Sequence, residues 1–134
     1  VKTLLRIARE RDKLTVIVAQ FGASTGAELL ADITAHAIRA TLQDPSKAGL
    51  YHAVAGGVTT WHGYARFVIE QAKAAGVELK AGPDAVEPVP TTAFPTPAKR
   101  PHNSRLDTSR LQSTFGLVLP EWQSGVARML RETF

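Results

Sequence analysis

The basic segment at residues 98–105 has the composition best suited to binding an anion. Arg100, Asn103 and Arg105 lie within six residues of one another, between prolines that restrict the backbone. A guanidinium group stays charged and donates paired hydrogen bonds, which suits a diphosphate. On composition alone, a solvated basic surface loop explains the segment slightly better.

A second candidate site is the loop that starts at Gln20 and ends at Thr25. An apolar, β-branched run precedes this loop and a helical pattern follows it. Free backbone amides and the helix dipole make such junctions common ligand sites. We therefore expect Gln20 and Thr25 to contribute to a pocket.

The residues needed for hydride transfer are missing from the chain. No Gly-x-Gly-x-x-Gly loop is present, and the tyrosines Tyr51 and Tyr64 are followed four residues later by Ala55 and Val68 rather than lysine. The four histidines show no metal-ligand spacing, and packing or surface roles explain them better. The pattern predicts ligand binding without a local catalytic or cofactor site.

The first half of the chain predicts alternating helices and strands. Residues 2–12 have a helical apolar face, residues 14–18 form a short β-branched run, and residues 49–54 look like a second strand. Between the two strands, Thr25 and Glu28 have the spacing of a capping box, which predicts a helix that ends near Pro45.

The second half predicts three more helices around a proline-rich segment. Thr59 or Thr60 can cap a helix that Gly76 ends, and Asp107 or Thr108 can cap one that Gly116 ends. A final helix opens at Pro120. Six of the eight prolines fall in the segment at about 81–103, which we expect to be an ordered, extended arm.

Composition limits the class of protein. The chain has 134 residues, a net charge of +4 and no cysteine, which excludes disulfides and fits a cytoplasmic protein. The basic residues are scattered, so we expect no nucleic-acid partner. No apolar run is long enough for a membrane span, and no secretory signal stands at the start. The missing initiator methionine suggests an excised piece.

Several segments together resemble the dTDP-4-dehydrorhamnose reductases, a family of extended short-chain dehydrogenases. The matching segments are residues 20–32, 49–52, 57, 60–61, 89–98, 100–108, 119–122 and 128–130. Members commonly have an acidic residue where this chain has Ala19 and a proline where it has Ser24. The resemblance covers essentially the whole chain.

The resemblance implies an α/β fold: the C-terminal substrate-binding lobe of an extended short-chain dehydrogenase, with mixed helices, short strands and an incomplete Rossmann sheet. Residues 1–134 would form the sugar-nucleotide-binding domain, and the nicotinamide-binding domain would lie upstream of the chain. The parent enzyme would reduce dTDP-4-dehydro-L-rhamnose to dTDP-L-rhamnose with NADPH or NADH. This chain alone would be inactive.

The same resemblance implies the site residues. Gln20, Thr25, Arg100, Asn103 and Arg105 would bind the dTDP-sugar.

It also implies a homodimer in some members, built around a cation such as Mg²⁺. Glu28 and Glu132 match its ligand positions, although capping explains Glu28 better. Two alternatives stay open: a non-catalytic nucleotide-sugar-binding, regulatory or partner-binding homologue, and another nucleotide-sugar reductase or epimerase.

Overall fold

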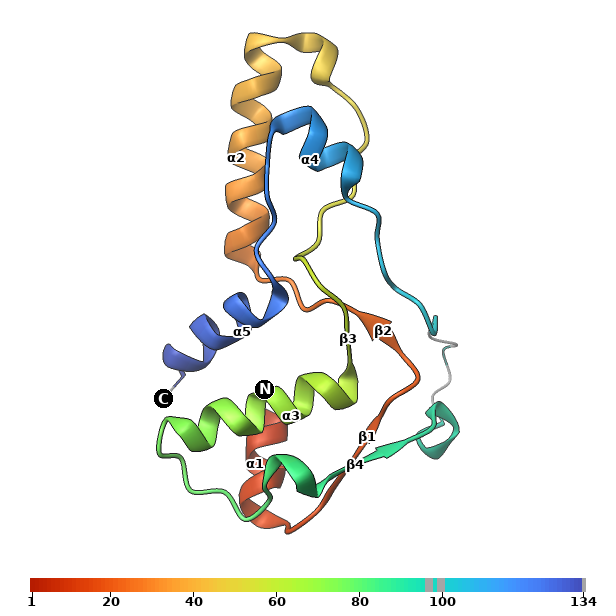
Figure 1. Ribbon diagram of the computed structural model, residues 1–134, viewed down its shortest axis with the longest axis vertical. Helices are drawn as coiled ribbons and strands as arrows, with labels where there is room; N and C mark the ends of the chain where they lie inside the picture. The colour runs from red at the N-terminus through yellow and green to blue at the C-terminus, as the bar shows by residue number, and fades with distance from the viewer. Residues whose placement is uncertain (96–97, 99–100, 134) are drawn as a thin grey trace.

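The computed structural model describes residues 1–95, 98 and 101–133. The chain folds into an elongated molecule of helices and short strands (Figure 1). Helices α2 (Ala27–Gln43) and α4 (Ser109–Phe115) lie side by side at one end. Helices α1 (Lys2–Glu10) and α3 (Trp61–Ala74) lie at the other end with the longer strands, and α5 (Trp122–Arg131) packs on α3. This arrangement confirms the predicted mixed helix and strand fold.

The longer strands form a parallel pair. Strand β1 (Leu14–Ile17) pairs with β4 (Val86–Val89), with Leu14 opposite Val86. Two further strands, β2 (Phe21–Gly22) and β3 (Thr59–Thr60), form a short antiparallel pair. Within the described residues, both sheets therefore have only two strands.

Three apolar clusters hold the helices and strands together. One joins α1, α3 and α5 through Leu5, Val68 and Trp122. A second places Ile69 of α3 beside the parallel strands. A third joins α2 to α4 through buried residues that include Ile33. The first two clusters fix the position of α3, which contributes to the site described below.

Several predicted helix ends are confirmed. The Thr60 hydroxyl accepts a hydrogen bond from the Gly63 amide at 3.1 Å, so Thr60 caps α3. Asp107 accepts from the Ser109 amide at 2.9 Å before α4. Gly76 and Gly116, which follow α3 and α4, have φ values of 82° and 63°. These left-handed conformations favour glycine.

The predicted capping box is wrong. Helix α2 begins at Ala27 after Gly26, and no side chain caps its first turn. The Thr25 hydroxyl donates to the Ala23 carbonyl and accepts from the Ala55 amide instead. A tertiary contact therefore takes the hydroxyl that a local motif would use.

Three predicted boundaries also need correction. Helix α1 ends at Glu10 rather than at residue 12, because the backbone of Arg11 is extended. Strand β1 ends at Ile17, and α5 begins at Trp122, so Pro120 precedes the helix rather than opening its first turn.

Residues 49–54 do not form the predicted strand, although partly buried side chains along them pack on the cluster between α2 and α4. No backbone hydrogen bond joins these residues to any other described segment. A strand requires a neighbouring strand, and the described part of the chain supplies none here.

Over its described residues, the proline-rich arm has regular local structure. It contains a 3₁₀ turn at Pro83–Ala85, strand β4 and a second turn at Thr91–Ala93. Pro88 lies in β4, which pairs on one side only among the described residues and so tolerates a proline. No helix in the described ranges is both long and apolar enough to cross a membrane.

Candidate functional site

A large hollow in the described structure has a volume of about 510 Å³. The 20–24 loop, the start of α3 and the 101–104 segment surround it, and Val1 also lines it. Its walls include the aromatic residues Phe21, Trp61 and Tyr64. Neutral polar side chains also line it, namely Gln20, Ser24, Thr59, Thr60 and Ser104. Aromatic walls with a few neutral polar groups are typical of small-molecule sites.

The backbone of Phe21 joins the three walls of this hollow. Phe21 pairs with Thr60 in the β2–β3 sheet. Its amide donates to the His102 carbonyl at 2.8 Å, and its carbonyl accepts from the Ser104 amide at 2.9 Å. The structure therefore brings together the two segments that the sequence predicted as ligand sites.

Arg105 lies beside this junction, and Asn103 fixes its direction. The Asn103 side-chain oxygen accepts from the Arg105 amide at 3.0 Å and from Arg105 Nε at 2.9 Å. The guanidinium carbon lies 5.8 Å from the centre of the Phe21 ring. Arg105 forms no ion pair with a carboxylate in the described residues, so its charge is available to an anion.

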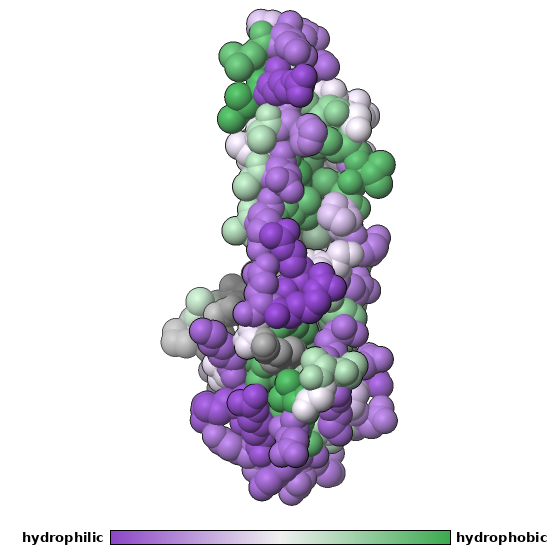
Figure 2. All heavy atoms as spheres, turned by 90° about the vertical axis from the view of Figure 1, so that its left-hand side faces the viewer, coloured by the Kyte–Doolittle hydropathy of each residue, from purple (hydrophilic) through white to green (hydrophobic). Residues whose placement is uncertain are grey.

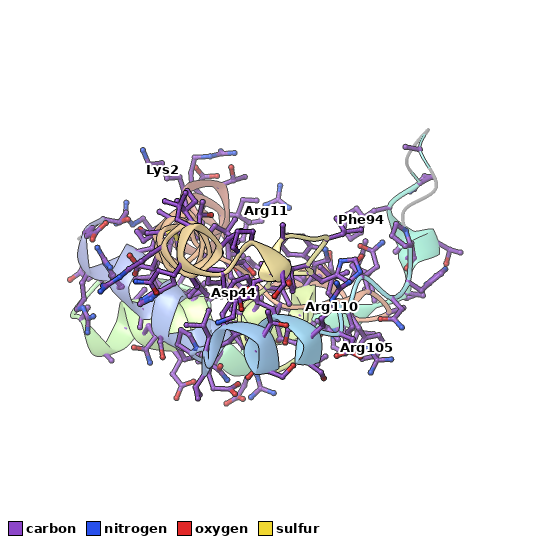
Figure 3. The ribbon with its side chains drawn as sticks, turned by 90° about the horizontal axis from the view of Figure 1, so that it is seen from above. Lys2, Arg11, Asp44, Phe94, Arg105 and Arg110 are labelled. Carbon is purple, nitrogen blue, oxygen red and sulfur yellow. The ribbon has the colours of Figure 1, made fainter. Side chains whose placement is uncertain are left out.

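Gln20 and Thr25 have different positions relative to the hollow. Gln20 lines it and also lines a neighbouring hollow of about 300 Å³, together with Trp61 and Phe94. Figure 3, which looks down the long axis, shows Phe94 and Arg105 on the same side of the molecule, away from Lys2. Thr25 instead supports the loop through its bonds to Ala23 and Ala55. Arg100 lies outside the described residues.

The residues that sequence reasoning missed are Ser24, Trp61 and Tyr64. Ser24 and Tyr64 both line the hollow, and their side chains are close enough to interact. Burial raises the pKa of Tyr64, and the bond from Ser24 opposes that shift in part. Helical spacing alone assigns Trp61 and Tyr64 to a buried face, so no local signal distinguishes them as site residues.

A row of aromatic rings connects the hollow to the core. The ring of Tyr64 lies 5.9 Å from that of half-exposed Trp61 and 6.1 Å from that of buried Trp122. Phe67 completes the row at 5.1 Å from Trp122. The wall of the hollow that α3 provides is therefore part of the packed core.

Comparison with known proteins identifies the family. The family model described as the RmlD substrate-binding domain matches residues 1–134. The chain belongs to the RmlD substrate-binding domain family. It is 62% identical over 133 residues to the dTDP-4-dehydrorhamnose reductase of Shigella flexneri, covering 99% of this chain and 44% of that protein.

Solved structures of two reductases resemble this RmlD substrate-binding domain. The dTDP-4-dehydrorhamnose reductase of Clostridium acetobutylicum superposes with a TM-score of 0.80 at 26% identity, over 98% of this chain and 42% of that one. The enzyme of Bacillus anthracis, solved in complex with NADP, gives a TM-score of 0.77 at 26% identity with the same coverage. The chain therefore spans less than half the length of the relatives that it matches.

The two glutamates predicted as metal ligands do not make a site within one RmlD domain. Glu28 lies in the first turn of α2, and Glu132 follows α5, where it pairs with Arg128 at 3.3 Å. Across the described ranges, no three acidic, histidine or cysteine side chains gather closely enough to hold a cation. Their role as ligands stays a prediction.

Proposed function

We propose that this chain is the part of a dTDP-4-dehydrorhamnose reductase that holds the nucleotide sugar. The observation that carries this proposal is the position of Arg105, directed by Asn103 beside a hollow whose described side chains are uncharged. The diphosphate would lie against Arg105 and Arg100, and the neutral sugar would lie inside the hollow against Gln20. Thr25 would contribute indirectly, by holding the 20–24 loop that lines the hollow in position.

The parent enzyme would reduce dTDP-4-dehydro-L-rhamnose to dTDP-L-rhamnose with NADPH or NADH. The relative from Bacillus anthracis that was solved with NADP supports a nicotinamide cofactor. Bound dinucleotide would supply the hydride, and the portion of the parent that this chain does not span would hold it. The residues of this chain would bind and orient the sugar nucleotide, and the chain alone would not turn over.

We infer that residues 49–54 are where that other portion attaches. These residues have a helical layer on one side and unpaired backbone groups. A strand added at this edge would satisfy those groups and extend the fold into a larger sheet.

A cytoplasmic location and a homodimer remain parts of the proposal. A Mg²⁺ ion held by Glu28 and Glu132 does not fit one chain, because no three candidate ligand side chains gather closely enough within the described residues. Two copies would have to contribute carboxylates together.

Calorimetric titration of the 134-residue chain tests the binding function. We expect heat of binding with dTDP-L-rhamnose, and a loss of affinity of about tenfold or more in Arg105→Gln, since a charge-assisted hydrogen bond is lost. The matched control Arg131→Gln removes an exposed arginine of α5 and should bind as the wild type does.

The alternatives predict other results. Tighter binding of UDP-glucose than of dTDP-L-rhamnose would indicate another nucleotide-sugar enzyme. A parent protein that binds the sugar nucleotide but does not oxidise NADPH with the keto-sugar would be a non-catalytic homologue.

A further inference from the structure

Two hydroxyl-bearing residues from distant parts of the sequence line the large hollow. Ser24 comes from the loop before α2, and Tyr64 comes from the first turn of α3. Both line the hollow, and the Ser24 side chain is close enough to Tyr64 to lower the pKa of its phenol. Sequence patterns assigned neither residue a ligand role.

Packing fixes the position of this pair. The Tyr64 ring lies between Trp61 and Trp122, and Tyr64 itself is only partly exposed. Ser24 follows Ala23, whose carbonyl accepts from Thr25. A hydroxyl held by ordered neighbours loses little freedom when it binds a ligand, which favours selective recognition.

The pair has hydrogen-bonding capacity left over. Each hydroxyl offers one donor and two acceptor positions. If Ser24 donates to the Tyr64 oxygen, the Tyr64 O–H remains free to donate to a group in the hollow. Burial keeps the phenol protonated by raising its pKa, so it is a neutral donor rather than an anion.

The charges around the hollow indicate which part of a ligand meets the pair. Among the described residues that line the hollow, no side chain is charged and the amino group of Val1 is the one charged group, whereas the guanidinium of Arg105 stands beside the hollow over Phe21. An anionic group gains most beside Arg105, and a neutral group with hydroxyls suits the interior. Phosphate therefore belongs near Arg105, away from Ser24 and Tyr64.

We propose that Ser24 and Tyr64 together select the sugar by hydrogen bonding to a hydroxyl group of the deoxyhexose ring. This assignment rests on the proposed function. It makes Tyr64 a specificity-determining residue that contacts the sugar directly, with Ser24 orienting its hydroxyl.

Substitution of Tyr64 by phenylalanine tests the assignment, because it removes the hydroxyl and keeps the ring. We expect Tyr64→Phe to lower the affinity for dTDP-L-rhamnose about three- to tenfold by calorimetry, which is the effect of losing one neutral hydrogen bond. The affinity for dTDP should stay unchanged. The matched control is Tyr51→Phe. The Tyr51 hydroxyl donates to the Lys47 carbonyl, and Tyr51 does not line the large hollow, so both ligands should bind this variant normally.

A second variant tests whether the two hydroxyls act as a unit. Ser24→Ala should lower the affinity for dTDP-L-rhamnose less than Tyr64→Phe does. The double variant should have the same affinity as Tyr64→Phe, because the effects of coupled groups do not add.

Equal weakening of dTDP and dTDP-L-rhamnose by Tyr64→Phe would overturn the assignment, and so would unchanged binding of both. Wild-type chain that binds neither ligand would instead overturn the proposed function, and this assignment with it.

Discussion

At the scale of single residues, Thr25 shows how one hydroxyl can hold a loop. It accepts from the Ala55 amide at 3.1 Å and donates to the Ala23 carbonyl at 3.3 Å. Ala55 is buried, so its amide has no solvent to replace this partner. The bond ties the loop that lines the hollow to the segment that leads into β3.

Replacing Thr25 by valine removes the hydroxyl at constant shape. We expect the free energy of unfolding to fall by about 1–3 kcal/mol, the cost of leaving a buried amide without a partner. The control is Thr34→Val in α2. The Thr34 hydroxyl donates to the Leu30 carbonyl on an exposed face, so this substitution should lower the free energy of unfolding by less than about 0.5 kcal/mol. Urea unfolding measures both, and equal losses would contradict the role of Thr25.

The candidate site was predictable only where its residues lie near one another in sequence. Asn103 and Arg105 are two positions apart, and local chemistry indicated both as candidate ligand residues; in the structure, Arg105 Nε donates to the Asn103 side-chain oxygen. Ser24 and Tyr64 are forty positions apart, and only the tertiary fold brings them together. Thr25 was assigned to a local cap because a sequence motif does not show that the Ala55 amide competes for its hydroxyl.

At the scale of helices and strands, the ends of the elements follow local rules. Gly76 and Gly116 end their helices in the left-handed region, as their positions after apolar helical patterns predicted. Residues 49–54 failed as a strand because a strand depends on a partner, which no local pattern can supply.

Two glycines with open space around them allow the effect of backbone conformation on stability to be measured apart from the effect of packing. A Cβ added at Gly76 or at Gly125 meets nothing within 4 Å, but only Gly76 has a positive φ, of 82°. We expect Gly76→Ala to lower the free energy of unfolding by about 1 kcal/mol or more. Gly125→Ala, inside α5, should raise it by about 0.5–1 kcal/mol. Thermal unfolding checks the opposite signs, and a stabilised Gly76→Ala would refute the explanation.

At the scale of the whole molecule, apolar side chains remain on the surface near α2. Ile38 and Leu42 in the last turns of α2 are exposed, as is Leu50 within the unpaired segment at residues 49–54. Figure 2 shows hydrophobic surface at the end of the molecule where these turns of α2 lie. Exposed apolar groups next to unpaired backbone are typical of a surface that another part of a protein covers.

Hydrogen exchange measures this incomplete edge directly. In the 134-residue chain we expect the amides of residues 50–54 to exchange faster than those of Ala55 and Gly56, which donate to Thr25 and to the Pro120 carbonyl. In the full-length parent, residues 50–54 should become protected if a strand pairs with them. Equal, strong protection of all these amides in the chain alone would argue against an open edge.

The row of aromatic rings also has an optical consequence. The chain contains two tryptophans. Trp61 is 52% exposed at the hollow, and Trp122 is 5% exposed in the core. A hydrated indole emits at longer wavelengths than a buried one, so a single fluorescence spectrum contains two separable signals. Quenching at the red edge reports an occupant beside Trp61, and loss of the blue component reports opening of the core around Trp122.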